Sequence, residues 1–185
     1  LMKKSTKVLI AIVIIVIIAL VGFFIYRAMN KEEEQKSNIT ITSAQDMENL
    51  VNTLYEGLEN TLPSLATTVV DVSDINAVTY STGLTSNENL EYVVTSEPLM
   101  SSQAYSLVLV KVKDGVNANK VAKEMSEKID TNKWICVSAE KVYATNSGSL
   151  VCLVMASEEW AKPVYEKFKS VAGTIGQEYE RTQEL

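Results

Sequence analysis

The chain has 185 residues with 23 acidic and 17 basic side chains, a formal net charge of −6, and no histidine. Without histidine, Ser-His and Cys-His nucleophile pairs, a histidine general base and histidine-based zinc sites are excluded. Cys136 and Cys152 are the two cysteines, too few for a zinc site of four thiolates. We therefore predict no catalytic residue, no metal ligand and no cofactor or cofactor-binding residue.

A long uncharged run lies near the start of the sequence: the nineteen residues from Val8 to Tyr26 carry no charge. A helix of about 20 apolar residues crosses the hydrocarbon core of a membrane, whereas the apolar region of a signal peptide has only about 7–15 and is followed by small residues. This run ends in bulky side chains, including Phe23 and Phe24. We therefore predict an uncleaved transmembrane helix over 8–26.

Charges on the two sides of this run predict its orientation. Lys3, Lys4 and Lys7 precede it without an acidic residue, and lysine and arginine are enriched on the cytoplasmic side of a membrane span. We expect a single-pass protein of the cell membrane with its C-terminal domain outside. Its predicted parts are a cytoplasmic tail (1–7), an anchor (8–26), a polar stalk (27–42), an extracytoplasmic domain (43–173) and a polar, frayed tail (174–185).

The charges after this run are unevenly distributed. Residues 32–110 hold twelve acids and one base, a net −11, whereas residues 111–185 hold eleven of each. Such an acidic half repels nucleic acid and anionic lipid headgroups, so no nucleic-acid partner is expected. It would accept a cation or a basic partner, although most acidic surfaces are only solvated.

The first element of the domain is a predicted helix that begins at Ser43. Ser43 and Asp46 form an S-x-x-D start signal, in which the serine caps free amides and the acid lies near the positive helix end. The helix is expected to end at Leu62, because the residue before Pro63 avoids the helical conformation. Five apolar residues share one face at helical spacing and should pack on a core: Met47, Leu50, Val51, Leu54 and Leu58.

The elements that follow alternate between strands and helices. Tyr105–Lys113 is the clearest strand, and its alternation of valine with lysine predicts one buried face. Leu150–Ala156 is apolar throughout and should be a central strand. In chain order we predict a short strand near 69–72, a helix over 75–80 that ends near 83, strands over 91–96 and 105–113, a helix over 117–130, a hairpin of 139–145 with 150–156, and a helix that starts between 157 and 163 and ends at 173.

Together these elements predict an α+β fold. After the transmembrane helix and an N-terminal helix comes a mainly antiparallel four-stranded sheet, in the element order β-β-α-β-β-α, with its helices on one face.

The cysteines are expected to stay apart. In the predicted hairpin Cys152 lies opposite roughly residues 141–143, too far along the ladder from Cys136 for a disulfide unless the connector at 134–138 folds back. We favour two reduced, mostly buried thiols, with a disulfide and a reactive thiol as open alternatives.

Three stretches within residues 80–172 carry a resemblance: "YSTGLTSNENLEYVVTSEPLM", "AYSLVLVKVKDG" and "KVYATNSGSLVCLVMASEE". This segment resembles a family of uncharacterised, membrane-tethered extracytoplasmic proteins of Gram-positive bacteria, known only as a domain of unknown function and often lipoproteins. The present sequence departs in having an apolar run in place of a lipidated cysteine, and in a short stretch between Asp130 and Lys141. The resemblance implies a fold pattern and an address outside the membrane, and it implies no catalytic residue.

Three functions remain open. The first is a non-enzymatic binding or accessory module at the cell surface, with the membrane and an unknown envelope protein or ligand as partners. The second is an envelope enzyme that uses serine, lysine, aspartate or tyrosine, for example Ser101 or Ser102 with Lys111, although chance explains such a pair. The third is an oligomeric assembly subunit that associates through its anchor or first helix.

Overall fold

The computed structural model describes residues 16–17, 19–22 and 37–183, and it divides the chain into two compact units, Leu1–Glu34 and Gln35–Leu185. Residues 16–17 and 19–22 are helical. Within the described residues no helix is both long enough and apolar enough to cross a membrane, and this finding corrects the predicted transmembrane helix. The rest of that predicted span, together with residues 1–7 and 27–36, lies outside the described residues.

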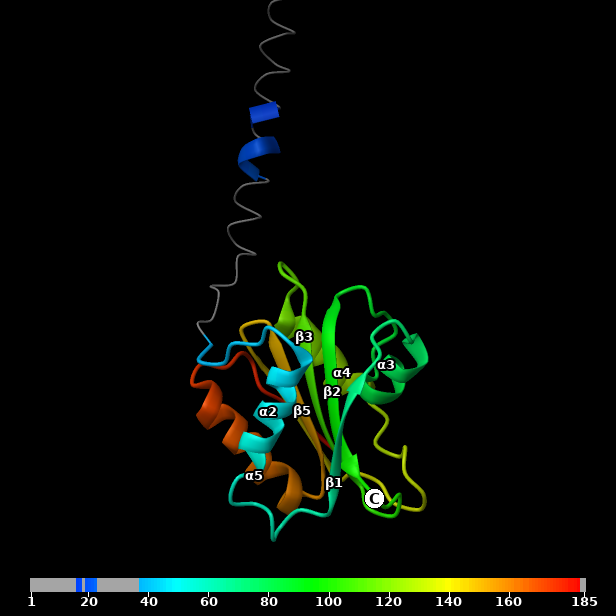
Figure 1. The fold of residues 1–185 in the computed structure, drawn as a ribbon. Coiled ribbons are helices and arrows are strands. Elements are labelled where there is room, and N and C mark those ends of the chain that lie inside the picture. Colours follow the sequence, from blue (N-terminus) through cyan, green and yellow to red (C-terminus); the bar gives the residue numbers. More distant parts are fainter. Residues whose placement is uncertain (1–15, 18, 23–36, 184–185) are drawn as a thin grey trace, which may run out of the picture. The chain divides into compact units, whose positions relative to one another are not determined.

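The second unit is built around an antiparallel sheet with the strand order β1-β2-β3-β5-β4-β6 (Figure 1). Its described elements in chain order are α2 (Ala44–Tyr55), β1 (Leu65–Val70), α3 (Ile75–Thr82), β2 (Leu90–Pro98), β3 (Tyr105–Val112), α4 (Ala118–Lys128), β4 (Lys141–Ser147), β5 (Leu150–Ala156), α5 (Glu158–Ala172) and β6 (Tyr179–Thr182).

The predicted four-stranded sheet is wrong, because the described residues form a sheet of six strands. The four expected strands correspond to β2, β3, β4 and β5, and the short strand expected near 69–72 is β1 at one edge of the same sheet. The other edge is β6, which lies in the tail that was expected to fray. This polar segment is stabilised by its pairing with β4 and by the Arg181 guanidinium, which donates to the carbonyl of Ile129 at 2.7 Å.

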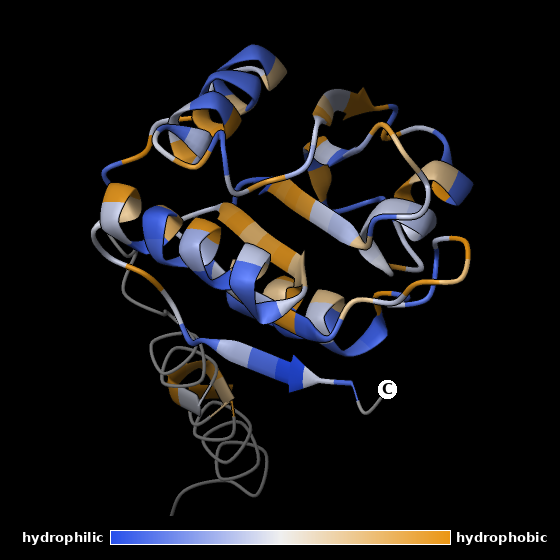
Figure 2. Cartoon of the chain, turned by 90° about the horizontal axis from the view of Figure 1, so that it is seen from below, coloured by the Kyte–Doolittle hydropathy of each residue, from blue (hydrophilic) through white to orange (hydrophobic). Residues whose placement is uncertain are grey.

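Helices cover both faces of the sheet, so the prediction of helices on one face is also wrong. One core lies between the sheet and helices α2 and α5, and a second lies on the other side under α3 and α4 (Figures 1 and 2). The reason is that β5, LVCLVMA, and most of β3, YSLVLVKV, carry apolar side chains on both faces, which need cover on both sides, and every residue of the two strands is buried. Lys111 indicated that one face of β3 is exposed to solvent. In the structure the Lys111 side chain is buried, and only its amino group extends to polar partners. It donates to the carbonyl of Val112 at 3.2 Å and lies 3.4 Å from the Glu91 carboxylate.

The predicted start of the first helix is confirmed. Ser43 caps α2: its hydroxyl accepts from the amide of Asp46 at 3.2 Å, and the Asp46 carboxylate accepts from the amide of Ser43 at 2.9 Å. The predicted inner face is buried at Met47, Leu50, Val51 and Leu54. The helix ends at Tyr55, earlier than the proline signal indicated.

Both cysteines are free thiols, as favoured from the sequence. The hairpin of β4 and β5 pairs Cys152 with Thr145, two residues further along β4 than expected, and Cys152 is buried in the core under α2 and α5. Cys136 is exposed, which corrects the expectation that both thiols are mostly buried. It has a φ of 59°, a left-handed conformation that non-glycine residues seldom adopt.

Candidate functional site

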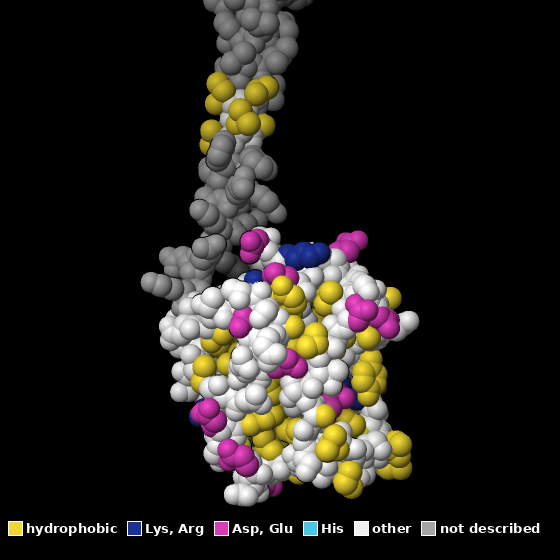
Figure 3. All heavy atoms as spheres, viewed as in Figure 1, with side chains coloured by type: hydrophobic (Ala, Val, Ile, Leu, Met, Phe, Trp, Pro, Cys, Tyr) yellow, Lys and Arg dark blue, Asp and Glu magenta, His cyan; other side chains and the backbone are white. Residues whose placement is uncertain are grey.

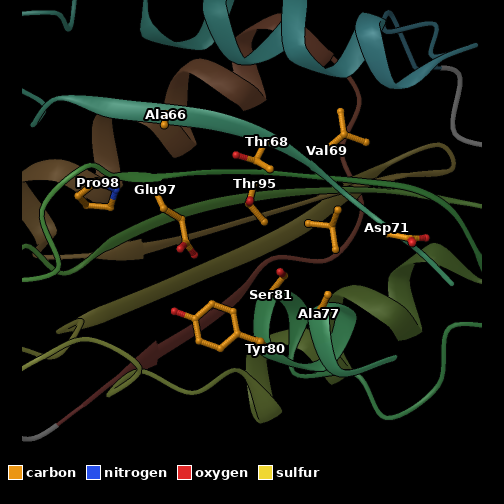
Figure 4. A pocket seen from close by; sticks show the side chains of 11 residues that line it. Ala66, Thr68, Val69, Asp71, Ala77, Tyr80, Ser81, Thr95, Glu97 and Pro98 are labelled. Carbon is orange, nitrogen blue, oxygen red and sulfur yellow. The ribbon is translucent and has the colours of Figure 1, made fainter. Parts of the chain in front are cut away.

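Part of the sheet is left uncovered on the side of α3 and α4. There the side chains of Ala66 and Thr68 on β1 are exposed. In the register between β1 and β2, Ala66 is paired with Glu97 and Thr68 with Thr95. A cavity of about 510 Å³ lies over these residues, and Tyr80 and Ser81 of α3 form its side (Figure 4). We call this cavity, defined by these six residues, the α3 groove. Asp71 lies at one end of it, and Glu97 and Pro98 lie toward the other (Figure 4).

The groove exists because α3 is short and fixed at both ends. Asp74 caps its start by accepting from the amides of Asn76 at 2.9 Å and Ala77 at 3.3 Å. Gly83 ends it in the left-handed conformation, with its amide donating to the carbonyl of Thr79 at 2.8 Å. A helix of eight residues covers only part of the β1–β2 face, and the remainder forms the floor of the groove.

A buried charge cluster closes the end of the groove near Glu97. The amino group of Lys133, whose side chain is only 2% exposed, donates to the Glu97 carboxylate and to the hydroxyl of Ser106 at 3.3 Å. The Ser106 hydroxyl in turn donates to Glu97 at 3.0 Å. Lysine, serine and glutamate therefore form a closed triangle in which each of these three contacts has a donor and an acceptor.

Aromatic rings complete the surroundings of Lys133. Its amino group lies 4.8 Å from the centroid of the Tyr80 ring and 5.4 Å from that of Trp134, both within the range of a cation–π contact. Desolvation lowers the pKa of Lys133, and the neighbouring Glu97 opposes that shift. Burial and the Glu97 charge raise the pKa of Tyr80, so this phenol is neutral at physiological pH.

This cluster holds the groove together and is poorly arranged for catalysis. A serine nucleophile needs access to substrate and a base that can take its proton, but Ser106 is fully buried and Lys133 donates to it. The pair considered from the sequence is not brought together. Ser101 and Ser102 lie in the turn after β2, whereas Lys111 pairs with Glu91 near the far end of β3, roughly 20 Å away at the rise of a strand.

Sequence reasoning missed Ser106 and Lys133, which are separated by 27 residues and lie on a strand and in an irregular connection. One signal was present: Ser106 is the polar residue within the apolar stretch YSLVLV. A buried hydroxyl in such a strand requires a polar partner, although the sequence does not say which one.

Exposed apolar side chains surround this end of the groove. Leu99, Met100 and Ile135 are 69%, 60% and 67% exposed, and Tyr80 is 53% exposed. The amide of Ile135 donates to the carbonyl of Ser101 at 3.2 Å, which brings the loop after α4 against the turn after β2. Figure 3 shows hydrophobic side chains gathered on the lower part of this side of the domain, among acidic ones. Exposed apolar groups of this kind are typical of contact surfaces.

A second cavity, of about 400 Å³, lies beside the stacked rings of Tyr143 and Tyr165. Four glutamates stand around it, but each forms an ion pair with a lysine: Glu158 with Lys162, Glu166 and Glu178 with Lys169, and Glu180 with Lys141. Three lysines balance most of the charge of these four glutamates, so this cavity offers a ligand little that is unsatisfied. Within the described residues no group of three acidic or cysteine side chains could hold a metal ion.

No family model, curated protein or solved structure matches this chain. The resemblance described above therefore stays a prediction, and the site is interpreted from its own geometry.

Proposed function

We propose that the protein is a non-enzymatic binding module that takes its ligand in the α3 groove. The observation that carries the proposal is the uncovered β1–β2 face, where Ala66 and Thr68 are exposed beside the half-exposed Tyr80. In a domain whose central strands are covered on both sides, an open patch of small residues next to an aromatic side chain is the surface that a ligand would cover.

The chemistry of the groove supports binding over reaction. Lys133, Glu97 and Ser106 satisfy one another, so the cluster presents neither a free base nor a free nucleophile to the cavity. The floor consists of small and hydroxyl-bearing side chains, which can contact a ligand without taking part in a reaction. The apolar run 8–26 and the lysines before it support an address at the cell membrane, with this domain outside.

Selection from a random library of displayed peptides tests this proposal with the full chain, solubilised in a mild non-ionic detergent. Peptides enriched on the wild type should bind about tenfold or more weakly to Thr68→Trp, because the indole fills the groove floor. The matched control is Thr182→Trp, the same change at an exposed threonine on the opposite edge strand, β6, which should bind the peptides like the wild type.

Thermal melts of both variants report whether each is folded. Enriched peptides that bind Thr68→Trp as tightly as the wild type would place binding elsewhere on the molecule. Failure to enrich any peptide above a protein-free support would count against the α3 groove as a binding site.

A further inference from the structure

The two edges of the sheet are built differently. β6 has four residues, and its charged side chains are engaged: Glu180 pairs with Lys141 at 2.9 Å, and Arg181 donates to carbonyls of 127 and 129 at 3.2 and 2.7 Å. β1 has six residues, LATTVV, without charge or proline, and its pairing with β2 shows no register shift. Charges, proline and bulges are the usual means of protecting an edge strand, and β1 has none of them.

The outer edge of β1 is available for pairing. Among the strands that the structure describes, β1 is the last in the sheet and pairs only with β2, so alternate backbone N–H and C=O groups point away from the sheet. Within residues 37–183 no backbone hydrogen bond other than this pairing involves Leu65–Val70. An extended chain could therefore satisfy these groups by adding one more strand.

This edge and the α3 groove form one continuous surface. Ala66 and Thr68 belong to β1 and also line the groove, so they face α3 (Figure 4). Side chains alternate between the two faces of a strand. Every second side chain of a strand added to β1 would lie on the groove side, near Tyr80, and backbone pairing would hold it there.

The charge around this surface favours a basic occupant. Residues 65–100 contain five acids and no base. Lysine already neutralises Glu91 and Glu97, but neither Asp71 nor Asp74 forms an ion pair within the described residues. Asp71 lies at the end of the groove, immediately after β1, where it would meet a side chain near the end of an added strand.

We infer that an extended segment of a partner polypeptide adds to β1 as a seventh strand, with uncharged side chains over the α3 groove and a basic side chain near Asp71 and Asp74. This inference rests on the proposed function and goes further by naming the ligand class and the way it is held. The backbone pairing would supply affinity, and the groove and the two aspartates would supply selectivity.

Synthetic peptides test the strand pairing directly. The probe is a capped peptide of about eight alternating valines and lysines, the length of a typical strand, titrated into the full chain in detergent. Two further versions carry N-methyl groups on the valines or on the lysines, and each removes the N–H donors of one peptide edge. At least one of them should bind about tenfold or more weakly, and a version with glutamate for lysine should bind more weakly still.

Three outcomes would overturn the inference. Equal binding of all N-methylated versions would show that the groove holds peptides without strand pairing, which leaves the proposed function standing. Absence of binding by the valine–lysine peptide would reject a basic extended ligand. A dimer in sedimentation that Thr68→Lys dissociates would show that a second copy of the chain occupies β1.

Discussion

Replacing Gly83 with alanine is expected to lower the free energy of unfolding by about 3 kcal/mol or more. A methyl group at this position would lie 2.5 Å from the backbone nitrogen of Ile129 and 2.6 Å from the carbonyl carbon of Lys128. These are backbone atoms at the end of α4 and cannot rotate away. The φ of 77° adds strain that glycine avoids.

Gly115→Ala is the matched control for this change. Gly115 has a φ of 79°, but a methyl group there would meet nothing within 4 Å. It should cost only about 1–2 kcal/mol, from the left-handed conformation alone. Denaturant unfolding of both variants measures the difference. Equal losses would show that α3 is not pressed against α4 at this point, and would weaken the case for a rigid groove wall.

Replacing Lys133 with methionine should also destabilise the domain, by about 3 kcal/mol. The change leaves the Glu97 carboxylate, whose side chain is 26% exposed, without its cation, and it removes a hydrogen bond to Ser106. For a domain of this size the melting temperature should fall by about 6–12 °C.

The double variant Lys133→Met, Glu97→Gln separates charge from packing. A buried ion pair contributes little compared with a neutral pair of similar volume, so the double variant should regain most of the stability lost in Lys133→Met. Chemical denaturation of the single and double variants forms the cycle. A double variant as unstable as the sum of the two single ones would mean that Lys133 and Glu97 act independently, contrary to their contact.

The elements that could be predicted are those with a strong local signal. The capping box at Ser43 and Asp46 and the all-apolar strand Leu150–Ala156 are found as expected. In each case neighbouring residues along the chain carry the information, through hydrogen bonds at the helix start or through burial on both strand faces.

The features that the sequence analysis missed depend on residues far apart in the chain. The polar β6 forms a strand because its backbone pairs with β4 and because Arg181 donates hydrogen bonds to carbonyls at the end of α4. Lys133 is buried because Tyr80 and Glu97 converge on it from other segments, beside its own neighbour Trp134. The α3 groove is the part of the β1–β2 face that α3 does not cover. No pattern of residues along the chain marks an uncovered surface of this kind.

Amide hydrogen exchange of the full chain, with and without a peptide enriched from the displayed library, tests the central claim most directly. The binding site proposed here predicts slower exchange confined to β1 and to the residues of α3 around Tyr80, with α2 and α5 unchanged. Protection of α2 and α5, or of the cavity beside Tyr143 and Tyr165, with β1 unaffected would contradict a binding site in the α3 groove.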